Sequence, residues 1–383
     1  MQDIYLDNSA TTKCLPEVAQ AVKKALLEQY GNPSSIHEKG VSSSEILNSC
    51  RQKAAETIAA APEQIYFTSG GTEANNLAIY GAVERHGQKG NHIISTEIEH
   101  PSVYRPLTNL EKKGFDVTRI SPDKNGLINP RDIKTSLRSD TILVSIMQVN
   151  NETGAIIPVK KIGEIVKNQK NPPLFHVDSI QGLGKICTQP GLWQADMASF
   201  SGHKLHAPKG TGFLYIKNKN LIAPQIWGGG QEKSMRSGTE NVPGLSGLQV
   251  ALENTTNFKP GNYNQTLADL QEYFITQAKE AIPEIIINTP VDQSAPHLIN
   301  FSLPGIKGEV MVNALSQKGI YISTGSACSS QNKRLSRVLK AMNLEKNTIE
   351  GALRVSFSPQ NTRSDIDKML KACKEEYKFL FND

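Results

Sequence analysis

Between about Ile65 and Ile216 the chain alternates short apolar runs with longer amphipathic stretches. Short apolar runs are typical of strands in a sheet whose two faces are both covered. We therefore predict strands at Ile65–Thr68, His92–Thr96, Thr141–Met147, Leu174–Val177, Met197–Phe200 and Gly212–Ile216. Apolar residues at helical spacing predict helices at Glu17–Gln29, Glu73–Val83 and Val159–Lys167. This alternation indicates an α/β domain.

The rest of the chain has a different pattern, which begins after a polar stretch rich in structure-breaking residues at 254–262. Such a stretch predicts a junction between domains. Beyond it we predict helices at Leu267–Ala281, Val310–Lys318, Ser336–Met342 and Ser364–Phe381, and strands near His297–Ser302 and Ala352–Phe357. We therefore expect a large domain at residues 15–256 and a smaller α+β domain at residues 1–14 with 257–383.

Composition and charge argue against several classes of protein. No apolar stretch approaches the roughly 20 residues that cross a bilayer, and the N-terminus lacks the pattern of a secretory signal, so we expect a cytoplasmic protein without membrane contact. The net charge is +5 with Lys and Arg interspersed among Asp and Glu, which does not indicate direct nucleic-acid binding. The five cysteines form no Cys-x-x-Cys pair, so we expect reduced thiols and no metal site.

The first candidate site is the segment Thr68–Asn75, in which a predicted strand passes through Gly70 and Gly71 into a helix. Glycines let the backbone approach a ligand closely, and the free N–H groups at a helix start bind phosphate, to which Thr72 can add its hydroxyl. The alternative is an ordinary capped helix after a tight turn. The segment has neither the Gly-Lys-Ser/Thr of a Walker A loop nor a dinucleotide Gly-x-Gly-x-x-Gly pattern, so a different phosphate ligand is expected.

The second and third candidates are Asp178 and Lys204, which follow two predicted strands at the edge where open α/β sheets bind ligands. Asp178 could simply cap a helix. In a pyridoxal-phosphate enzyme a carboxylate at such a place keeps the ring nitrogen protonated. A lysine is usually solvated, but Lys204 is flanked by Ser201 and His203 as further phosphate donors, and a partly desolvated lysine can form a Schiff base.

These segments together resemble the NifS and IscS cysteine desulfurases, a branch of the class V aminotransferase-like, fold-type I pyridoxal-phosphate enzymes. The resemblance extends over nearly the whole chain, and besides the Asp178 and Lys204 segments it includes Tyr5–Thr12, Gly31–Ser35, Thr68–Glu73, Glu99–His100, Val149–Gly154, Arg236–Asn241 and Ser323–Cys328. It implies a fold-type I transferase, with a large domain built on a mixed, mainly parallel sheet and a smaller α+β domain. It also implies pyridoxal 5'-phosphate as the cofactor.

The resemblance also assigns roles to single residues. Lys204 would anchor the cofactor covalently, and Asp178 would pair with its ring nitrogen. The other ring contacts would be His100, stacked on the ring and active in proton transfer, Gln181 at the ring hydroxyl, and Asn150 beside ring and substrate. The phosphate would be bound by Gly71, Thr72, Ser201 and His203, and by Thr239 from the other subunit of a homodimer.

Arg354 would bind the substrate carboxylate, a task that suits the paired donors of a guanidinium. Without the resemblance, a domain-bridging ion pair would be the favoured interpretation of Arg354, and a hydrogen-bonded loop histidine that of His100.

Cys328 is the candidate nucleophile. A free cysteine is most often a small buried hydrophobe, but the neighbours of Cys328 are small, polar and then basic, which is typical of a loop. An unperturbed thiol is only slightly ionised near neutral pH, and Lys333 and Arg334 nearby, or the approaching substrate, could raise that fraction. Structural roles are expected for Cys14, Cys50, Cys187 and Cys373.

The resemblance implies conversion of L-cysteine to L-alanine, with the sulfur left on Cys328 as a persulfide and passed to an acceptor protein. Three alternatives stay open: a selenocysteine lyase, an aminotransferase of the same fold, and a non-catalytic sulfur carrier or scaffold. The acceptor, either an iron–sulfur scaffold or a tRNA-thiolating enzyme, also stays open. Residues 329–339 depart from the Leu-Glu-Pro-Ser type of sequence common in the family.

Overall fold

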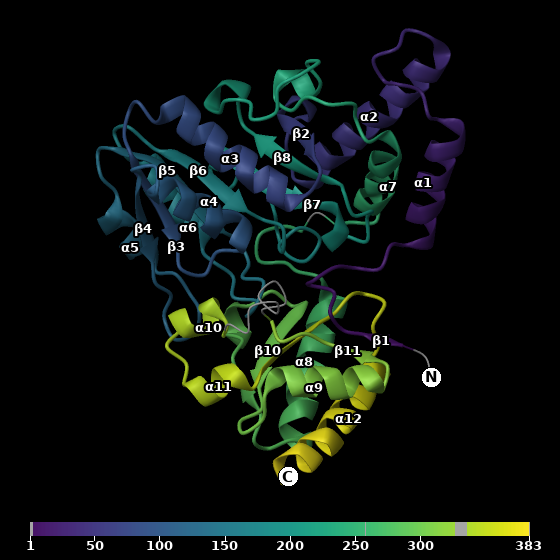
Figure 1. Cartoon of the computed structure of the whole chain (residues 1–383), viewed down its shortest axis with the longest axis vertical. Helices are drawn as coiled ribbons and strands as arrows, with labels where there is room; N and C mark the ends of the chain where they lie inside the picture. The colour runs from purple at the N-terminus through teal and green to yellow at the C-terminus, as the bar shows by residue number, and fades with distance from the viewer. Residues whose placement is uncertain (1–2, 257, 326–334, 383) are drawn as a thin grey trace.

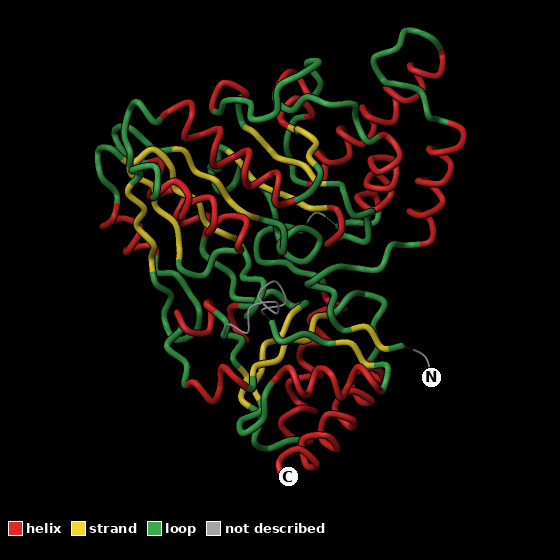
Figure 2. Tube along the Cα trace, viewed as in Figure 1, coloured by secondary structure: helices red, strands yellow, loops and turns green. Residues whose placement is uncertain are grey.

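The computed structural model of the chain describes residues 3–256, 258–325 and 335–382. Figure 1 shows a larger part built around one wide sheet and a smaller part near which both chain ends lie. In Figure 2 the strands of the smaller part lie on its side nearer the larger part, with helices on its outer side. In the described parts of the chain, no helix has the length and apolar character that crossing a bilayer requires.

The larger part contains a seven-stranded sheet of order β2-β8-β7-β6-β5-β3-β4. Its strands are β2 (Ile65–Thr68), β3 (His92–Thr96), β4 (Asp116–Ile120), β5 (Thr141–Met147), β6 (Leu174–Asp178), β7 (Met197–Ser201) and β8 (Gly212–Ile216). Neighbouring strands are parallel except that β8 runs antiparallel to both β2 and β7. The carboxyl ends of β2, β5, β6 and β7 therefore meet at one edge of the sheet.

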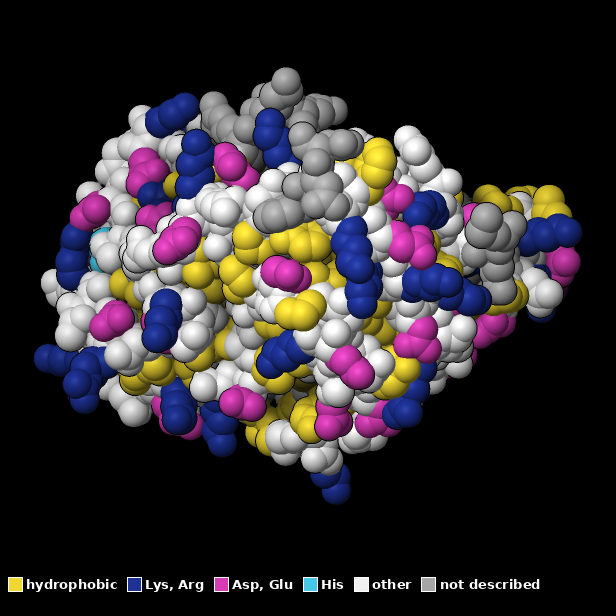
Figure 3. Space-filling model, turned by 90° about the horizontal axis from the view of Figure 1, so that it is seen from below, with side chains coloured by type: hydrophobic (Ala, Val, Ile, Leu, Met, Phe, Trp, Pro, Cys, Tyr) yellow, Lys and Arg dark blue, Asp and Glu magenta, His cyan; other side chains and the backbone are white. Residues whose placement is uncertain are grey.

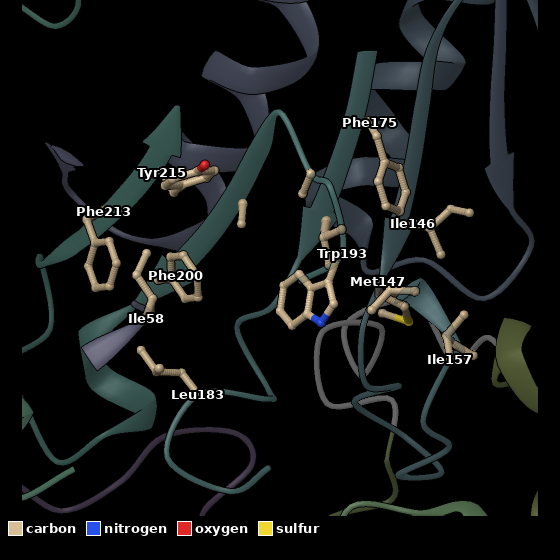
Figure 4. Close-up of a cluster of buried hydrophobic side chains, with 14 of the residues drawn as sticks. Ile58, Ile146, Met147, Ile157, Phe175, Leu183, Trp193, Phe200, Phe213 and Tyr215 are labelled. Atoms are coloured by element: carbon tan, nitrogen blue, oxygen red, sulfur yellow. The ribbon is translucent and has the colours of Figure 1, made fainter. Parts of the chain in front are cut away.

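Both faces of this sheet are buried, as the alternating side chains of β8 show. Leu214 and Ile216 belong to one apolar cluster, whereas Phe213 and Tyr215 belong to another on the opposite face. Figure 4 shows part of the second cluster, in which the rings of Phe200 and Phe213 stack with centroids 4.6 Å apart. Each fully buried large side chain contributes about 1.5–3 kcal/mol to stability, so these clusters stabilise the packing of helices on both faces of the sheet.

Helices cover both faces of the sheet. They are α1 (Pro16–Glu28), α2 (Glu38–Thr57), α3 (Gly71–His86), α4 (Pro101–Glu111), α5 (Pro130–Ser136), α6 (Val159–Lys167) and α7 (Val242–Glu253). Helix α3 packs against α4 and across β5 to β8, so its N-terminus lies near the edge where the strands end. On the other side, α1 and α2 pack against α7.

The smaller part contains two small sheets. In one, β12 (Ala352–Ser356), β10 (Leu298–Ser302) and β9 (Ile286–Ile287) are antiparallel, and in the other β1 (Ile4–Tyr5) pairs in parallel with β11 (Ile320–Tyr321). Its helices are α8 (Gln265–Ala281), α9 (Gly308–Gln317), α10 (Arg337–Ala341), α11 (Lys346–Glu350) and α12 (Arg363–Asn382). Figure 3 views this end of the molecule, where basic and acidic side chains are interspersed.

The predicted strands and the fold class are confirmed. Strands β2, β3, β5 and β8 have the predicted bounds, and β6 and β7 each extend one residue further, to Asp178 and Ser201. The sequence patterns did not predict β4, whose Asp116 and Arg119 break the apolar run at the sheet edge, nor helix α2. Helix α2 buries mainly small or polar residues, among them Gly40, Ser43 and Ala54, and so presents no apolar stripe.

We propose the domain division at residues 15–256 and at residues 1–14 with 257–383. Ile4 and Leu6 pack in the same apolar cluster as α8, α9 and α12, which supports assigning the N-terminal residues to the smaller domain. Helices α10 and α11 are a local exception, since Val338, Leu339 and Ile349 pack in the cluster of the larger sheet.

Candidate active site

A cleft of about 960 Å³ lies at the edge where the strands end. Asp178 from the end of β6, Ser201 from the end of β7 and Gly71 from the start of α3 line it, and Arg354 of β12 lines it from the smaller part. The predicted site residues on its walls are Gly71, Thr72, His100, Asp178, Gln181, Ser201, His203, Lys204 and Arg354. Residues that lie far apart in the sequence are therefore brought to one place.

The predicted phosphate cradle lies where β2, β7 and β8 run side by side. Gly212 of β8 is paired in register with both Thr68 and Ser201. Gly70 has a φ of 150°, which favours glycine, and a β-carbon on Gly71 would come within 2.1 Å of the Ile180 side chain. Gly70 and Gly71 therefore have no side chain that covers the backbone N–H groups at the start of α3.

The polar groups of this cradle fit a phosphate. Ser201 Oγ is buried without a hydrogen-bond partner among the described residues, and the first N–H groups of a helix have none within the helix. Burial and the neighbouring Lys204 lower the pKa of His203 to about 4, so its ring is neutral at neutral pH. A phosphate group would accept hydrogen bonds from these donors at the positive end of the α3 dipole.

Lys204 lies in the short 3-10 helix Gly202–Lys204 that follows β7. Its Nζ donates hydrogen bonds to the backbone carbonyls of Ser9 and Ala10, the second at 2.8 Å. A second amine is close, because Lys185 Nζ donates to the Lys204 carbonyl at 2.6 Å, and burial lowers the pKa of Lys185 to about 7. Lys204 lines the cleft, whereas Lys185 lies behind it.

Asp178 is a buried carboxyl group whose pKa is raised by burial. Its Oδ1 accepts a hydrogen bond from the Ile180 N–H at 3.1 Å, and its Oδ2 accepts one from Asn75 Nδ2 at 2.8 Å, and both bonds favour the ionised form. A protonated ring nitrogen would supply the positive charge that this carboxylate needs. Asp178 therefore fits its predicted role.

His100 caps the N-terminus of α4. Its Nδ1 accepts a hydrogen bond from the Ser102 N–H at 3.1 Å and lies 2.7 Å from Ser102 Oγ. Burial lowers the pKa of His100 to about 4, with further contributions from Lys204 and Arg337, so the ring is neutral at neutral pH.

Arg354 makes an ion pair with Asp7, but both residues belong to the proposed smaller domain, so this pair is not the domain-bridging one that was the alternative to its predicted role. Its Nη2 lies 2.7 Å from Asp7 Oδ1, and its Nη1 donates to the Asn151 carbonyl at 2.8 Å. Arg354 Nε is buried and has no partner among the residues that the structure describes. The guanidinium therefore ties the N-terminal segment to β12 and still lines the cleft.

Of the remaining predicted residues, Gln181 lies at the cleft wall and Asn150 does not. Gln181 Nε2 donates to the Ser9 carbonyl at 3.0 Å at the cleft wall. Asn150 is not on that wall, because its fully buried amide donates to the Ile98 carbonyl and accepts the N–H groups of Glu152 and Thr153. We propose that Asn150 shapes the loop whose neighbouring residues reach the cleft.

Thr239 is exposed and does not line the cleft of its own chain. The segment before it is tied to the cradle, since Arg236 Nε lies 2.8 Å from Oε1 of Glu73 in the first turn of α3. That Thr239 reaches the phosphate of another subunit stays a prediction.

Cys328 lies outside the described residues. Burial raises the pKa of Cys14, Cys50, Cys187 and Cys373, to about 12 for Cys373, so these thiols are held protonated. Neither they nor the other described residues form a group of three or more His, Cys, Asp or Glu that could hold a metal ion.

Several cleft residues were not predicted from the sequence. Ser9 and Ala10 belong to the segment Tyr5–Thr12, in which no residue has a predicted role, yet their carbonyls accept hydrogen bonds from Lys204. Arg337 and Tyr104 also line the cleft, with Arg337 Cζ 3.8 Å from the centroid of the Tyr104 ring. No sequence pattern marked either residue as part of the site.

Glu99 is a buried carboxyl group behind the cleft, and burial raises its pKa to about 8. Its Oε1 accepts hydrogen bonds from Thr96 Oγ1 at 2.6 Å and from the Met147 N–H at 3.1 Å, while Oε2 is buried without a partner among the described residues. Glu99 is therefore protonated at neutral pH and anchors the turn before His100 to the end of β5.

Glu99→Gln is expected to become increasingly stabilising, relative to the wild type, as the pH rises from 5 toward 8. The folded protein holds a proton on Glu99 that the unfolded chain releases above the ordinary pKa of 4.5, so the wild type loses stability across this window and glutamine does not. The difference in unfolding free energy should grow by up to about 1.4 kcal/mol per pH unit. Urea unfolding at pH 5 and pH 8 checks this, and an equal difference at both pH values would contradict it.

Comparison with known proteins places this geometry in a family. The model of the family described as aminotransferase class-V matches residues 4–369. A cysteine desulfurase IscS of Methanosarcina thermophila is 41% identical over 99% of this chain and 93% of that protein. A putative cysteine desulfurase IscS 1 of Bacillus subtilis is 37% identical over 97% of each chain. Among solved structures, a NifS-like protein superposes with a TM-score of 0.90 at 34% identity, over 99% of this chain and 100% of its own.

The chain therefore belongs to the aminotransferase class-V family, whose members depend on pyridoxal phosphate. Within that family it groups with the IscS and NifS cysteine desulfurases. A further similar structure, described as SspA in complex with cysteine, has a TM-score of 0.82 at 30% identity and covers 94% of this chain.

Proposed function

We propose that this chain is a cysteine desulfurase that binds pyridoxal phosphate through Lys204 and converts L-cysteine to L-alanine. The observation that carries this proposal is the single cleft in which Lys204, the buried carboxyl group of Asp178 and an anion cradle with an unpaired Ser201 hydroxyl come together. The likeness to the IscS relatives supports the same activity. When bound, pyridoxal phosphate withdraws electrons from an attached amino acid and so acidifies its α-proton.

The residues of the chain divide the remaining tasks. Gly71, Thr72, Ser201 and His203 would hold the phosphate of the cofactor, and Asp178 would keep its ring nitrogen protonated. Arg354 binds the substrate carboxylate with its guanidinium, which orients the α-carbon toward Lys204. Lys204 Nζ would move the α-proton of the substrate, and the neutral ring of His100 would assist a second proton transfer.

Cys328 supplies the nucleophile. Its thiolate attacks the substrate sulfur, so that an S–S bond forms and the carbon–sulfur bond of cysteine breaks. The β-carbon gains a proton and leaves in L-alanine, while Cys328 keeps the sulfur as a persulfide. No external oxidant is needed, because the persulfide sulfur is oxidised as the carbon is reduced.

Cys328→Ala is expected to abolish alanine formation from L-cysteine while the protein keeps the absorption of its bound cofactor. The reason is that the variant retains Lys204, Asp178 and the cradle but has no acceptor for the sulfur. Alanine release and the absorption spectrum of the protein measure the two effects. Cys14→Ala is the matched control and should keep both the alanine formation and the cofactor absorption of the wild type. Alanine formation by Cys328→Ala at the wild-type rate would contradict the proposal.

The same experiment separates the alternatives. An aminotransferase would need a keto acid and would tolerate loss of Cys328, whereas a non-catalytic carrier or scaffold would bind no chromophore. Selenocysteine as a competing substrate tests the lyase alternative. We propose a homodimer in which Thr239 reaches the cofactor phosphate of the other subunit. We also propose an acceptor protein for the sulfur, which loading Cys328 with labelled sulfur in a cell extract would identify.

A further inference from the structure

Asn75 and Ser102 connect two residues of the proposed cofactor site. Asn75 is fully buried in α3, and Ser102 is buried in the first turn of α4. Asn75 Nδ2 lies 2.8 Å from Ser102 Oγ and 2.8 Å from Asp178 Oδ2. Ser102 Oγ lies 2.7 Å from His100 Nδ1. A continuous chain of hydrogen bonds therefore runs from Asp178 to His100.

The direction of each hydrogen bond follows from what each group can donate. The ionised carboxylate of Asp178 only accepts, so one proton of Asn75 Nδ2 goes to Asp178 and the other goes to Ser102 Oγ. The Ser102 hydroxyl, which accepts from Asn75, then donates its own proton to His100 Nδ1. The backbone N–H of Ser102 donates to the same nitrogen at 3.1 Å. His100 Nδ1 is therefore an acceptor, and the proton of the neutral ring is on Nε2.

We propose that Asn75 and Ser102 are positioning residues that hold His100 in its Nε2–H tautomer and link it to Asp178. This inference rests on the proposed function, because it confines proton transfer by His100 to Nε2. A proton on Nδ1 would face two donor groups of Ser102, so Nδ1 exchanges no proton while the chain of hydrogen bonds is intact.

Asn75 acts on both ends of the chain. Its amide donates to the Asp178 carboxylate, which favours the ionised form that the ring nitrogen needs. The same amide occupies a lone pair of Ser102 Oγ and so turns the hydroxyl proton toward His100. Asn75 is fully buried, so both acceptors take their hydrogen bond from the protein and not from solvent. Its loss should therefore disturb Asp178 and His100 together, whereas loss of the Ser102 hydroxyl should disturb His100 alone.

The test uses the holoenzyme labelled with nitrogen-15 at histidine. His100→Gln assigns the two ring resonances of His100 by their disappearance. In the wild type we expect a protonated Nε2 and an unprotonated Nδ1. Ser102→Ala removes the hydroxyl donor to Nδ1 and keeps the backbone N–H donor, so the Nδ1 resonance should move part of the way toward that of a ring in exchange between tautomers. The kcat for alanine formation should fall about five- to tenfold with KM within about twofold.

Three further variants make the result specific. Ser102→Thr keeps a hydroxyl and should restore both the resonance and kcat. Asn75→Ala should lower kcat more than Ser102→Ala and should also change the absorption of the cofactor, because it removes a donor from Asp178. Ser246→Ala removes a hydroxyl near the start of α7 that donates to the Pro243 carbonyl, and it should change neither quantity.

A His100 ring protonated on Nδ1 in the wild type would overturn this inference, and so would Ser102→Ala with an unchanged resonance and an unchanged kcat. These outcomes are separate from a failure of the proposed function. The tautomer is measured without turnover, so a wild-type enzyme that forms no alanine would overturn the proposed function and leave the assignment of Asn75 and Ser102 standing.

Discussion

Lys204→Ala is expected to lower the rate of alanine formation from L-cysteine by about 10³-fold or more. The substitution removes both the covalent anchor of the cofactor and the amine that moves the α-proton. It should also remove the visible absorption of the lysine-bound cofactor, although the cradle at Gly71 and Ser201 can still hold the phosphate. Alanine release and the absorption spectrum of the reconstituted protein check the two effects.

The matched control is Lys160→Ala, which removes an exposed lysine of α6. It should leave both the spectrum and the rate unchanged. A Lys204→Ala protein that retains half of the wild-type rate would show that another group anchors the cofactor and moves the proton.

Arg354→Ala is expected to raise KM for L-cysteine at least about tenfold and to lower the free energy of unfolding by about 3 kcal/mol. The first effect follows from the proposed binding of the substrate carboxylate. The second follows from the ion pair with Asp7, in which the Arg354 side chain is 3% exposed and the Asp7 side chain 19% exposed. Steady-state kinetics and urea unfolding measure the two effects separately.

Asp7→Asn separates the two roles of Arg354. It breaks the same ion pair and should lower stability, but it leaves the guanidinium in the cleft, so KM should not rise. An equal increase of KM in both variants would show that Arg354 acts only through the position of the N-terminal segment.

Local sequence patterns predicted the strands and helices in which buried residues are continuous or recur at a regular spacing along the chain. The strands β5 and β8 are buried along their whole length, so continuous apolar runs marked their bounds. Strand β4 lies at the sheet edge, where Asp116 is exposed and Arg119 pairs with Glu111, and no apolar run marks it. Helix α7 is buried at residues all around its axis, so its apolar residues lack a single-sided helical spacing.

The sequence predicted those site residues whose type alone suits the proposed chemistry, namely Lys204, Asp178 and the glycines of the cradle. The connections between these residues were not predictable, because they depend on contacts between segments distant in sequence. The carbonyl of Ser9 accepts from Lys204, and Asn75 of α3 joins Asp178 to Ser102. Asparagine is common on solvated helix surfaces, so its residue type does not mark Asn75 as part of a site. Only the packing of α3 on β6 and α4 brings it to its two acceptors, Asp178 and Ser102.

The claim that Lys204 is the cofactor-binding lysine is tested most directly by borohydride reduction of the holoenzyme, followed by proteolysis and mass mapping. Reduction makes the bond between lysine and cofactor permanent, so the modified peptide identifies the lysine. We predict the added mass on the peptide that contains Lys204. The sharpest competitor is Lys185, whose buried amine has its pKa lowered to about 7 and donates to the Lys204 carbonyl. A modified Lys185 beside an unmodified Lys204 would contradict the account.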